Sequence, residues 1–160
     1  MELSVFSDEH FMREALKEAQ KAFDVDEVPV GAVIDSNNQI IARAHNLTEC
    51  LNDVTAHAEM QGITSAANFL NGKYLNECTL YVTLEPCMMC AGAIAWTQLG
   101  KLVYGASDTK RGFKLLNDKR VLHPKTIVKS GILEEECATL MKTFFQKIFC
   151  RVHTPQSVTQ

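Results

Sequence analysis

The chain has 160 residues, of which 46% are hydrophobic and 22% charged, and its formal net charge at pH 7 is −3. This length suits one domain, and the composition is that of a globular protein rather than of a disordered chain. No basic N-terminal cap precedes a long apolar run, and no stretch approaches the roughly 18 apolar residues of a membrane span. We therefore expect one domain over residues 1–150, a frayed tail over 151–160, no membrane partner and a cytoplasmic location.

The first half of the chain alternates helical and β patterns. Ser7 is followed by acids and by apolar residues at helical spacing, which predicts a capped amphipathic helix over 8–23. Two β-rich runs within 28–44 are separated by the polar tripeptide at 36–38, which is typical of a tight hairpin turn. A polar stretch follows, and residues 55–70 then return to a helical period.

The second half continues the alternation. Residues 78–84 alternate and are β-branched, which predicts a buried strand that ends before Pro86. The later predicted elements are a helix over 87–99, a short strand over 101–106, a strand over 126–131 and a closing helix over 133–149, with 107–125 harder to assign. Strands alternating with helices indicate an α/β fold, in which helices cover both faces of a mostly parallel sheet that the opening hairpin makes mixed.

Three potential metal ligands stand at the starts of two predicted helices. His57 opens one helix, and Cys87 and Cys90 lie three residues apart at the start of another. That spacing puts both sulfurs on one helix face, where the helix N-terminus favours the thiolate form that a metal needs. Thiolates and imidazole suit zinc, and three protein ligands rather than four leave a position for water, as in catalytic sites. We expect one zinc ion per chain.

Glu59 lies two residues beyond His57, in the same predicted helical turn. Zinc lowers the pKa of its bound water from about 15.7 toward about 7, so that hydroxide becomes available at neutral pH. The Glu59 carboxylate can take the proton from that water and later deliver it to a departing amine, acting first as base and then as acid. This chemistry is a hydrolytic deamination at an amidine-type carbon, and Glu59 is its predicted catalytic residue.

Each of these residues alone has a more ordinary explanation. A single CxxC pair is also typical of thiol redox proteins, a lone histidine is usually structural, and a lone glutamate is usually a solvated helix charge. The combination of the three features favours a zinc enzyme. The other four cysteines stand alone on apolar or mixed stretches and are predicted to be core thiols: Cys50, Cys78, Cys137 and Cys150.

Charge is distributed unevenly along the chain. Between Lys101 and Lys129, eight basic residues stand against two acids, which gives +6 for this segment and leaves −9 for the rest. Phosphate contacts dominate affinity for nucleic acids, so this segment is a candidate RNA surface. Phe113 and His123 add rings on which unstacked bases can lie. The alternative is an ordinary solvated loop.

The sequence resembles the bacterial tRNA-specific adenosine deaminases from about residue 8 to residue 150. The resemblance rests on the His-x-Glu and Pro-Cys-x-x-Cys signature of zinc deaminases, together with VPVGAVI, TAHAEM, YVTLEPCMMCAGAI, VYGASD and GILEEEC. It implies a cytidine-deaminase-like fold, a three-layer α/β/α sandwich around a mixed sheet of about five strands. It also implies a homodimer and conversion of the wobble adenosine of a tRNA anticodon to inosine, with the anticodon stem-loop as substrate.

The resemblance further implies which residues bind the substrate. In the family pattern His57, Cys87 and Cys90 bind zinc and Glu59 moves the proton. The implied substrate contacts come from Asn46, which hydrogen-bonds the flipped purine, from the Ala58 backbone and the corner from Leu84 to Pro86, which line the pocket, and from Asp108, which contacts the RNA backbone.

Two other functions are compatible with the same residues. A deaminase of a free nucleobase or nucleoside, of the guanine or cytosine type, would use the same chemistry and fits the net charge of −3. A zinc-stabilised RNA-binding module without catalysis would keep the metal ligands, although it would have no need of Glu59.

Overall fold

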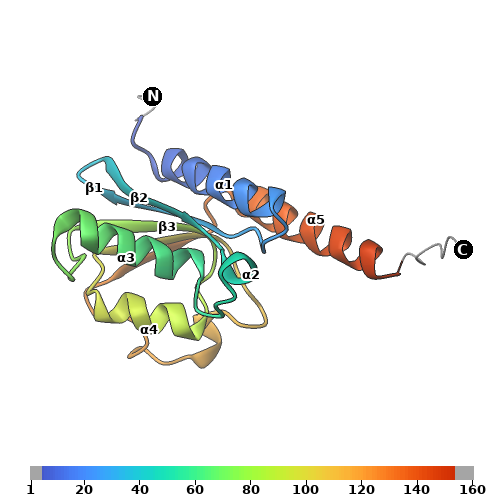
Figure 1. Cartoon of the computed structure of the whole chain (residues 1–160). Coiled ribbons are helices and arrows are strands. Elements are labelled where there is room, and N and C mark those ends of the chain that lie inside the picture. Colours follow the sequence, from blue (N-terminus) through green and yellow to red (C-terminus); the bar gives the residue numbers. More distant parts are fainter. Residues whose placement is uncertain (1–4, 154–160) are drawn as a thin grey trace, which may run out of the picture.

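A computed structural model describes residues 5–153, which form a five-stranded sheet between two layers of helices (Figure 1). In chain order the elements are α1 (Asp8–Asp24), β1 (Gly31–Ser36), β2 (Gln39–His45), α2 (Thr48–Leu51), α3 (Ala58–Leu70), β3 (Cys78–Leu84), α4 (Met88–Trp96), β4 (Lys101–Ala106), the 3-10 turn η1 (Phe113–Leu116), β5 (Ile127–Ser130) and α5 (Glu134–His153). The predicted three-layer α/β class is confirmed.

The strands lie in the order β2-β1-β3-β4-β5. β1 is antiparallel to both β2 and β3, whereas β4 is parallel to both β3 and β5. The prediction of a mixed but mostly parallel sheet is confirmed, since β2, β3, β4 and β5 run in one direction and β1 runs against them. After β2 the chain crosses β1 through α3, so β3 pairs with the first strand of the hairpin and runs parallel to the second.

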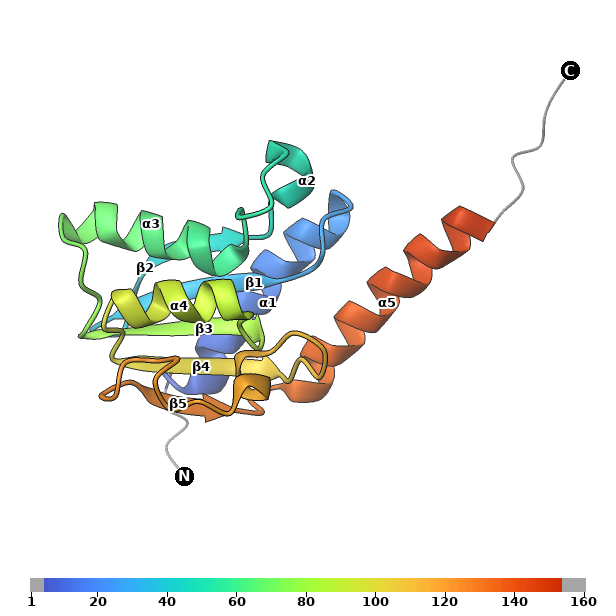
Figure 2. The same ribbon diagram turned by 90° about the horizontal axis from the view of Figure 1, so that it is seen from below.

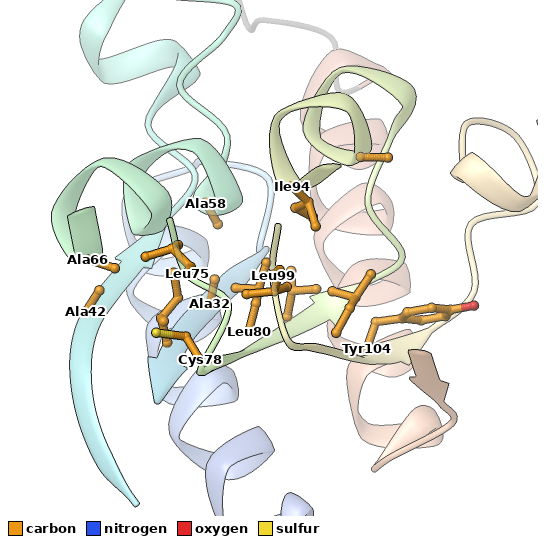
Figure 3. Close-up of a cluster of buried hydrophobic side chains, with 14 of the residues drawn as sticks. Ala32, Ala42, Ala58, Ala66, Leu75, Cys78, Leu80, Ile94, Leu99 and Tyr104 are labelled. Carbon is orange, nitrogen blue, oxygen red and sulfur yellow. The ribbon is translucent and has the colours of Figure 1, made fainter. Parts of the chain in front are cut away.

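Successive residues of the central strands pack on opposite faces of the sheet. On β3, Leu80 and Val82 face the layer of α3 and α4, while Tyr81 packs beneath α1. Figure 2 shows α3 and α4 together on one face and α1 on the other. Figure 3 shows the hydrophobic cluster between the sheet and the layer of α3 and α4. It contains Leu80, Leu99 and Tyr104 together with Ala58 and Ala66 of α3 and Ile94 of α4. Because side chains alternate between the two faces of a strand, neighbouring residues of β3 pack against different helices.

The close packing of α1 on β1 depends on Gly31. A Cβ atom there would overlap the backbone of Ala15 and Ala19 in α1. Only glycine permits so close an approach of two backbones. The helix itself begins as predicted, because the Ser7 side chain accepts a hydrogen bond from the His10 backbone amide at 3.2 Å.

Asp8, in the first turn of α1, ties this helix to three strands. Its carboxylate accepts hydrogen bonds from the Tyr81 hydroxyl at 2.9 Å, from Lys101 at 3.0 Å and from Lys129 at 2.8 Å. Burial alone would raise the pKa of Asp8, but these hydrogen bonds outweigh it and hold the pKa below the ordinary value of 3.8. The folded chain therefore stabilises the ionised form of Asp8.

We expect Asp8→Asn to lower the free energy of unfolding at pH 7 by about 1 kcal/mol, since its lysine partners are partly exposed. A carboxyl whose pKa is depressed by folding contributes stability above its unfolded-state pKa, and that contribution is lost as pH falls through the folded-state pKa. Denaturant unfolding from neutral pH to below the ordinary value of 3.8 measures this effect. If the stability difference between Asp8→Asn and the unchanged protein stayed the same in acid, the ionised Asp8 carboxylate would not be the stabilising group.

Several segments differ from their predictions. The polar stretch after β2 contains the helix α2, and α5 runs to His153, three residues into the predicted tail. The rest of that tail, 154–160, lies outside the described residues. Cys78 and Cys137 are buried, but Cys50 and Cys150 are exposed, so the prediction of core thiols is wrong for the latter two. Within residues 5–153, every helix is too short or too polar to cross a bilayer.

Candidate metal and substrate site

The site lies where β3 ends and the N-terminal ends of α3 and α4 meet (Figure 2). His57 is the N-cap of α3 and Cys87 is the N-cap of α4, both with extended backbone. Cys90 follows in the first turn of α4 and is fully buried. Pro86 precedes the α4 cap, and its fixed φ suits a chain that turns from a strand into a helix. The predicted metal ligands are therefore brought together from two helix starts.

The three ligand atoms have distances that suit a tetrahedral ion. His57 Nδ1 lies 3.5 Å from Cys90 Sγ and 3.7 Å from Cys87 Sγ. Zinc bonds of about 2.3 Å to sulfur and about 2.05 Å to nitrogen, at tetrahedral angles, would separate these atoms by about 3.6 Å. All three ligand atoms lie within 4.8 Å of one another. The donor set and its spacing therefore fit a metal ion with three protein ligands.

The two sulfurs differ in how readily they ionise. A hydrogen bond from Cys90 is the largest of the effects that lower the pKa of Cys87 to about 4, and one from His57 also contributes. The bond to Cys87, together with burial, raises the pKa of Cys90. Cys87 is thus ready as a thiolate, whereas Cys90 gives up its proton when a metal binds, since metal ligands must be deprotonated.

Glu59 lies in the first turn of α3 and is only 4% exposed. It lines the same cavity as His57 and Cys87. Burial raises the pKa of Glu59 to about 7. A carboxyl group that titrates near neutral pH can accept a proton in one step and return it in the next.

A cavity of about 200 Å³ opens beside these residues. Its walls include four of the five predicted substrate-binding residues: Asn46, Ala58, Leu84 and Asp108. The fifth, Pro86, is not among the lining residues, and its carbonyl oxygen instead accepts a hydrogen bond from the Phe113 amide at 3.0 Å. Pro86 thus anchors the loop that follows β4.

Asp108 organises that loop from within. Its Oδ1 accepts hydrogen bonds from the backbone amides of Lys110 and Arg111, both at 2.9 Å. Its backbone carbonyl accepts a third from Gly112 at 3.0 Å. The resulting turn brings Arg111 to the cavity wall. The predicted contact of Asp108 with an RNA backbone stays a prediction.

Several residues at the cavity have no pattern in the sequence that marks them as part of a site. Val28, Val30 and Thr48 line it, and Glu27 lies behind the wall against Asn46. The other two lining residues belong to predicted features: Glu85 to the corner from Leu84 to Pro86, and Arg111 to the basic segment. A strand that enters a cavity has the same apolar pattern as any buried strand, so VPVGAVI indicates a strand and nothing more. An isolated acid such as Glu27 has no partner that sequence spacing can reveal.

Comparison with known proteins places this geometry in a family. The model of the MafB19-like deaminase family matches residues 6–148. The tRNA-specific adenosine deaminase of Bacillus subtilis is 48% identical over 146 residues, which cover 88% of this chain and 90% of that protein. The chain belongs to the tRNA-specific adenosine deaminase family. The resemblance predicted from the sequence is therefore confirmed.

Solved structures agree with this membership. One, from work on A-to-I editing by tRNA:A34 deaminases at the wobble position of transfer RNA, is 44% identical with a TM-score of 0.76, covering 82% of this family member and 98% of that chain. The guanine deaminase of Bacillus subtilis is 33% identical with a TM-score of 0.63, covering 69% of this chain and 74% of that one. The fold is the cytidine-deaminase-like fold that the resemblance implied.

Proposed function

We propose that the chain is a zinc-dependent hydrolytic deaminase that converts the wobble adenosine of a tRNA anticodon to inosine. One observation carries this proposal: a His/Cys/Cys donor set at tetrahedral distances adjoins a buried glutamate in a cavity. Membership in the tRNA-specific adenosine deaminase family supports the substrate.

In the proposed reaction His57, Cys87 and Cys90 hold the zinc ion, whose Lewis acidity lowers the pKa of water and makes a nucleophile available at neutral pH. The Glu59 carboxylate takes the proton of that water. It then gives the proton to the purine ring nitrogen as hydroxide bonds to the adjacent carbon that carries the amine. Glu59 next moves a proton from the added hydroxyl to the amine, so that the carbon–nitrogen bond breaks and ammonia departs. Its raised pKa of about 7 suits both halves of this cycle.

The cavity beside Glu59 has a volume of about 200 Å³, which suits one extruded base better than an intact duplex. Asn46 would hydrogen-bond the base, and Ala58 and Leu84 would line its pocket. Arg111 and Asp108 line the same cavity, and the exposed Lys110 lies next to Arg111 in the chain, so these two basic residues can meet the phosphates. Reading a single-stranded anticodon loop in this way needs no duplex recognition.

The uncovered side of α4 supports the predicted homodimer. This helix, MMCAGAIAW, has no charged residue, yet only Cys90, Ala91 and Ile94 are buried. Trp96 is 85% exposed and borders a groove of about 880 Å³ against residues 120–124. A helix that is apolar on all sides is normally covered on all sides. A second copy of the chain would cover this one.

Light scattering tests the dimer. We expect the unchanged protein to have the mass of two chains and Trp96→Lys to have the mass of one. Phe149→Lys, which alters an exposed aromatic residue on α5 instead, should stay dimeric. The mass of one chain for the unchanged protein would refute the homodimer.

A free nucleobase is the second candidate substrate, favoured by the similarity to a guanine deaminase. Ammonia release separates the two. We expect release from a tRNA whose anticodon begins with adenosine and none from free guanine, cytosine or adenosine at the same enzyme concentration. Turnover of a free base with none on tRNA would establish the second candidate and overturn the first.

A further inference from the structure

Glu27, in the connection between α1 and β1, is a charged residue with only 1% of its surface exposed. Its Oε1 accepts a hydrogen bond from the Cys50 amide at 2.6 Å. Its Oε2 accepts from Asn46 Nδ2 at 3.1 Å, from the Glu49 amide at 3.2 Å and from the Thr48 hydroxyl at 3.4 Å. All four donors are neutral, so hydrogen bonds alone compensate for the burial of this carboxylate.

The same hydrogen bonds determine how Asn46 is oriented. An ionised carboxylate only accepts hydrogen bonds, so the carboxamide of Asn46 must turn its NH2 group toward Glu27. The Thr48 hydroxyl donates to Glu27 and accepts from the same Asn46 nitrogen at 3.2 Å. The carbonyl oxygen of Asn46 therefore lies on the side away from Glu27. Asn46 and Thr48 both line the cavity, and Glu27 lies behind them.

We propose that Glu27 is a positioning residue for this site: its buried carboxylate sets the orientation of the Asn46 carboxamide and holds the first turn of α2 at the cavity rim. The part of this inference that concerns the substrate rests on the proposed function. A base that enters the cavity then meets Asn46 already oriented, which saves the cost of ordering this side chain during binding.

The isosteric variant Glu27→Gln tests this directly. Glutamine replaces one acceptor oxygen by an NH2 group, which faces Cys50 in one orientation and Glu49 and Asn46 in the other. Either way a buried donor loses its acceptor, and Asn46 can regain a partner only by flipping. We expect kcat/KM on tRNA to fall by about 10- to 100-fold with zinc content unchanged. Asp35→Asn is the matched control, because Asp35 is also a buried acid but lies near the far end of β1.

A double-mutant cycle asks whether Glu27 acts through Asn46. In an Asn46→Ala background, measured by single turnover with excess enzyme, Glu27→Gln should cause less than about a 2-fold further loss. Losses of the two single variants that simply multiply would overturn the proposal, because Glu27 would then act independently of Asn46. A loss equal to that of Asp35→Asn would overturn it too.

Amide hydrogen exchange of the zinc-loaded protein without substrate provides a readout that does not depend on the reaction. The Glu49 and Cys50 amides should be protected in the unchanged protein and exchange at least about 10-fold faster in Glu27→Gln, since their acceptor is weakened. Equal exchange in both proteins would refute the positioning role. If the unchanged protein deaminated a free base and not tRNA, the proposed function would fail while the same cycle on that base would still decide the role of Glu27.

Discussion

Glu59→Ala should lower the rate of deamination by about 100- to 10,000-fold while zinc remains bound. The Glu59 carboxylate is the proposed proton carrier. The two other acids that line the cavity are placed differently, because Asp108 Oδ1 is held by the Lys110 and Arg111 amides and Glu85 follows β3 rather than lying in the helical turn that His57 caps. The change leaves the proposed metal ligands His57, Cys87 and Cys90 in place. Single-turnover inosine formation and metal analysis of the same sample measure both results.

The control for Glu59→Ala is Glu9→Ala. Glu9 is also an acid in the first turn of a helix, but it is exposed on α1. It should have unchanged activity and zinc content. If Glu59→Ala deaminated tRNA as fast as the unchanged protein, Glu59 would not be the proton carrier. If the unchanged protein and Glu59→Ala both bound tRNA and neither deaminated any substrate, the chain would be better described as a zinc-stabilised RNA-binding module.

Cys87→Ala and Cys90→Ala should each lose zinc and stability together. Two remaining ligands hold zinc weakly, and the free energy of metal binding is also free energy of folding. A loss of about 4 kcal/mol would lower Tm by roughly 10 °C in a domain of this size. Metal analysis and thermal unfolding measure the two losses on the same preparation.

Cys50→Ala separates loss of a ligand from loss of any cysteine. Cys50 is exposed and its sulfur is not part of the ligand group. Its replacement should leave zinc content and Tm unchanged. Full zinc occupancy in both Cys87→Ala and Cys90→Ala would show that the metal is held elsewhere.

The grouping of the candidate metal ligands with Glu59 could be predicted in part, because two of their relationships are local. His57 and Glu59 share one helical turn, and Cys87 and Cys90 share another, so residue spacing alone gives their placement. The two helical turns meet because of the sheet: β3 ends just before Cys87 and places it beside His57 at the start of α3. Residue spacing does not predict this contact between the two turns, whereas the family resemblance implies it.

Contacts between segments that are far apart in the sequence could not be predicted from the pattern of residues. The hydrophobic period predicts that β3 is a strand but not that it pairs with β1 and leaves β2 at the edge. In the same way, nothing in the sequence distinguishes Glu27 from the other acids. Its role depends on the fold, which places Asn46 and the start of α2 against it. Long-range pairing of this kind is decided by packing, which local propensity does not contain.

Inosine at position 34 is the most direct test of the central claim. Purified zinc-loaded protein is incubated with a tRNA whose anticodon begins with adenosine and with the same tRNA carrying guanosine there, and the nucleoside at each position is identified. The proposed function predicts inosine at position 34 of the first tRNA, no change in the second and no product with Glu59→Ala. Absence of inosine at high enzyme concentration, or its formation at other adenosines instead, would contradict it.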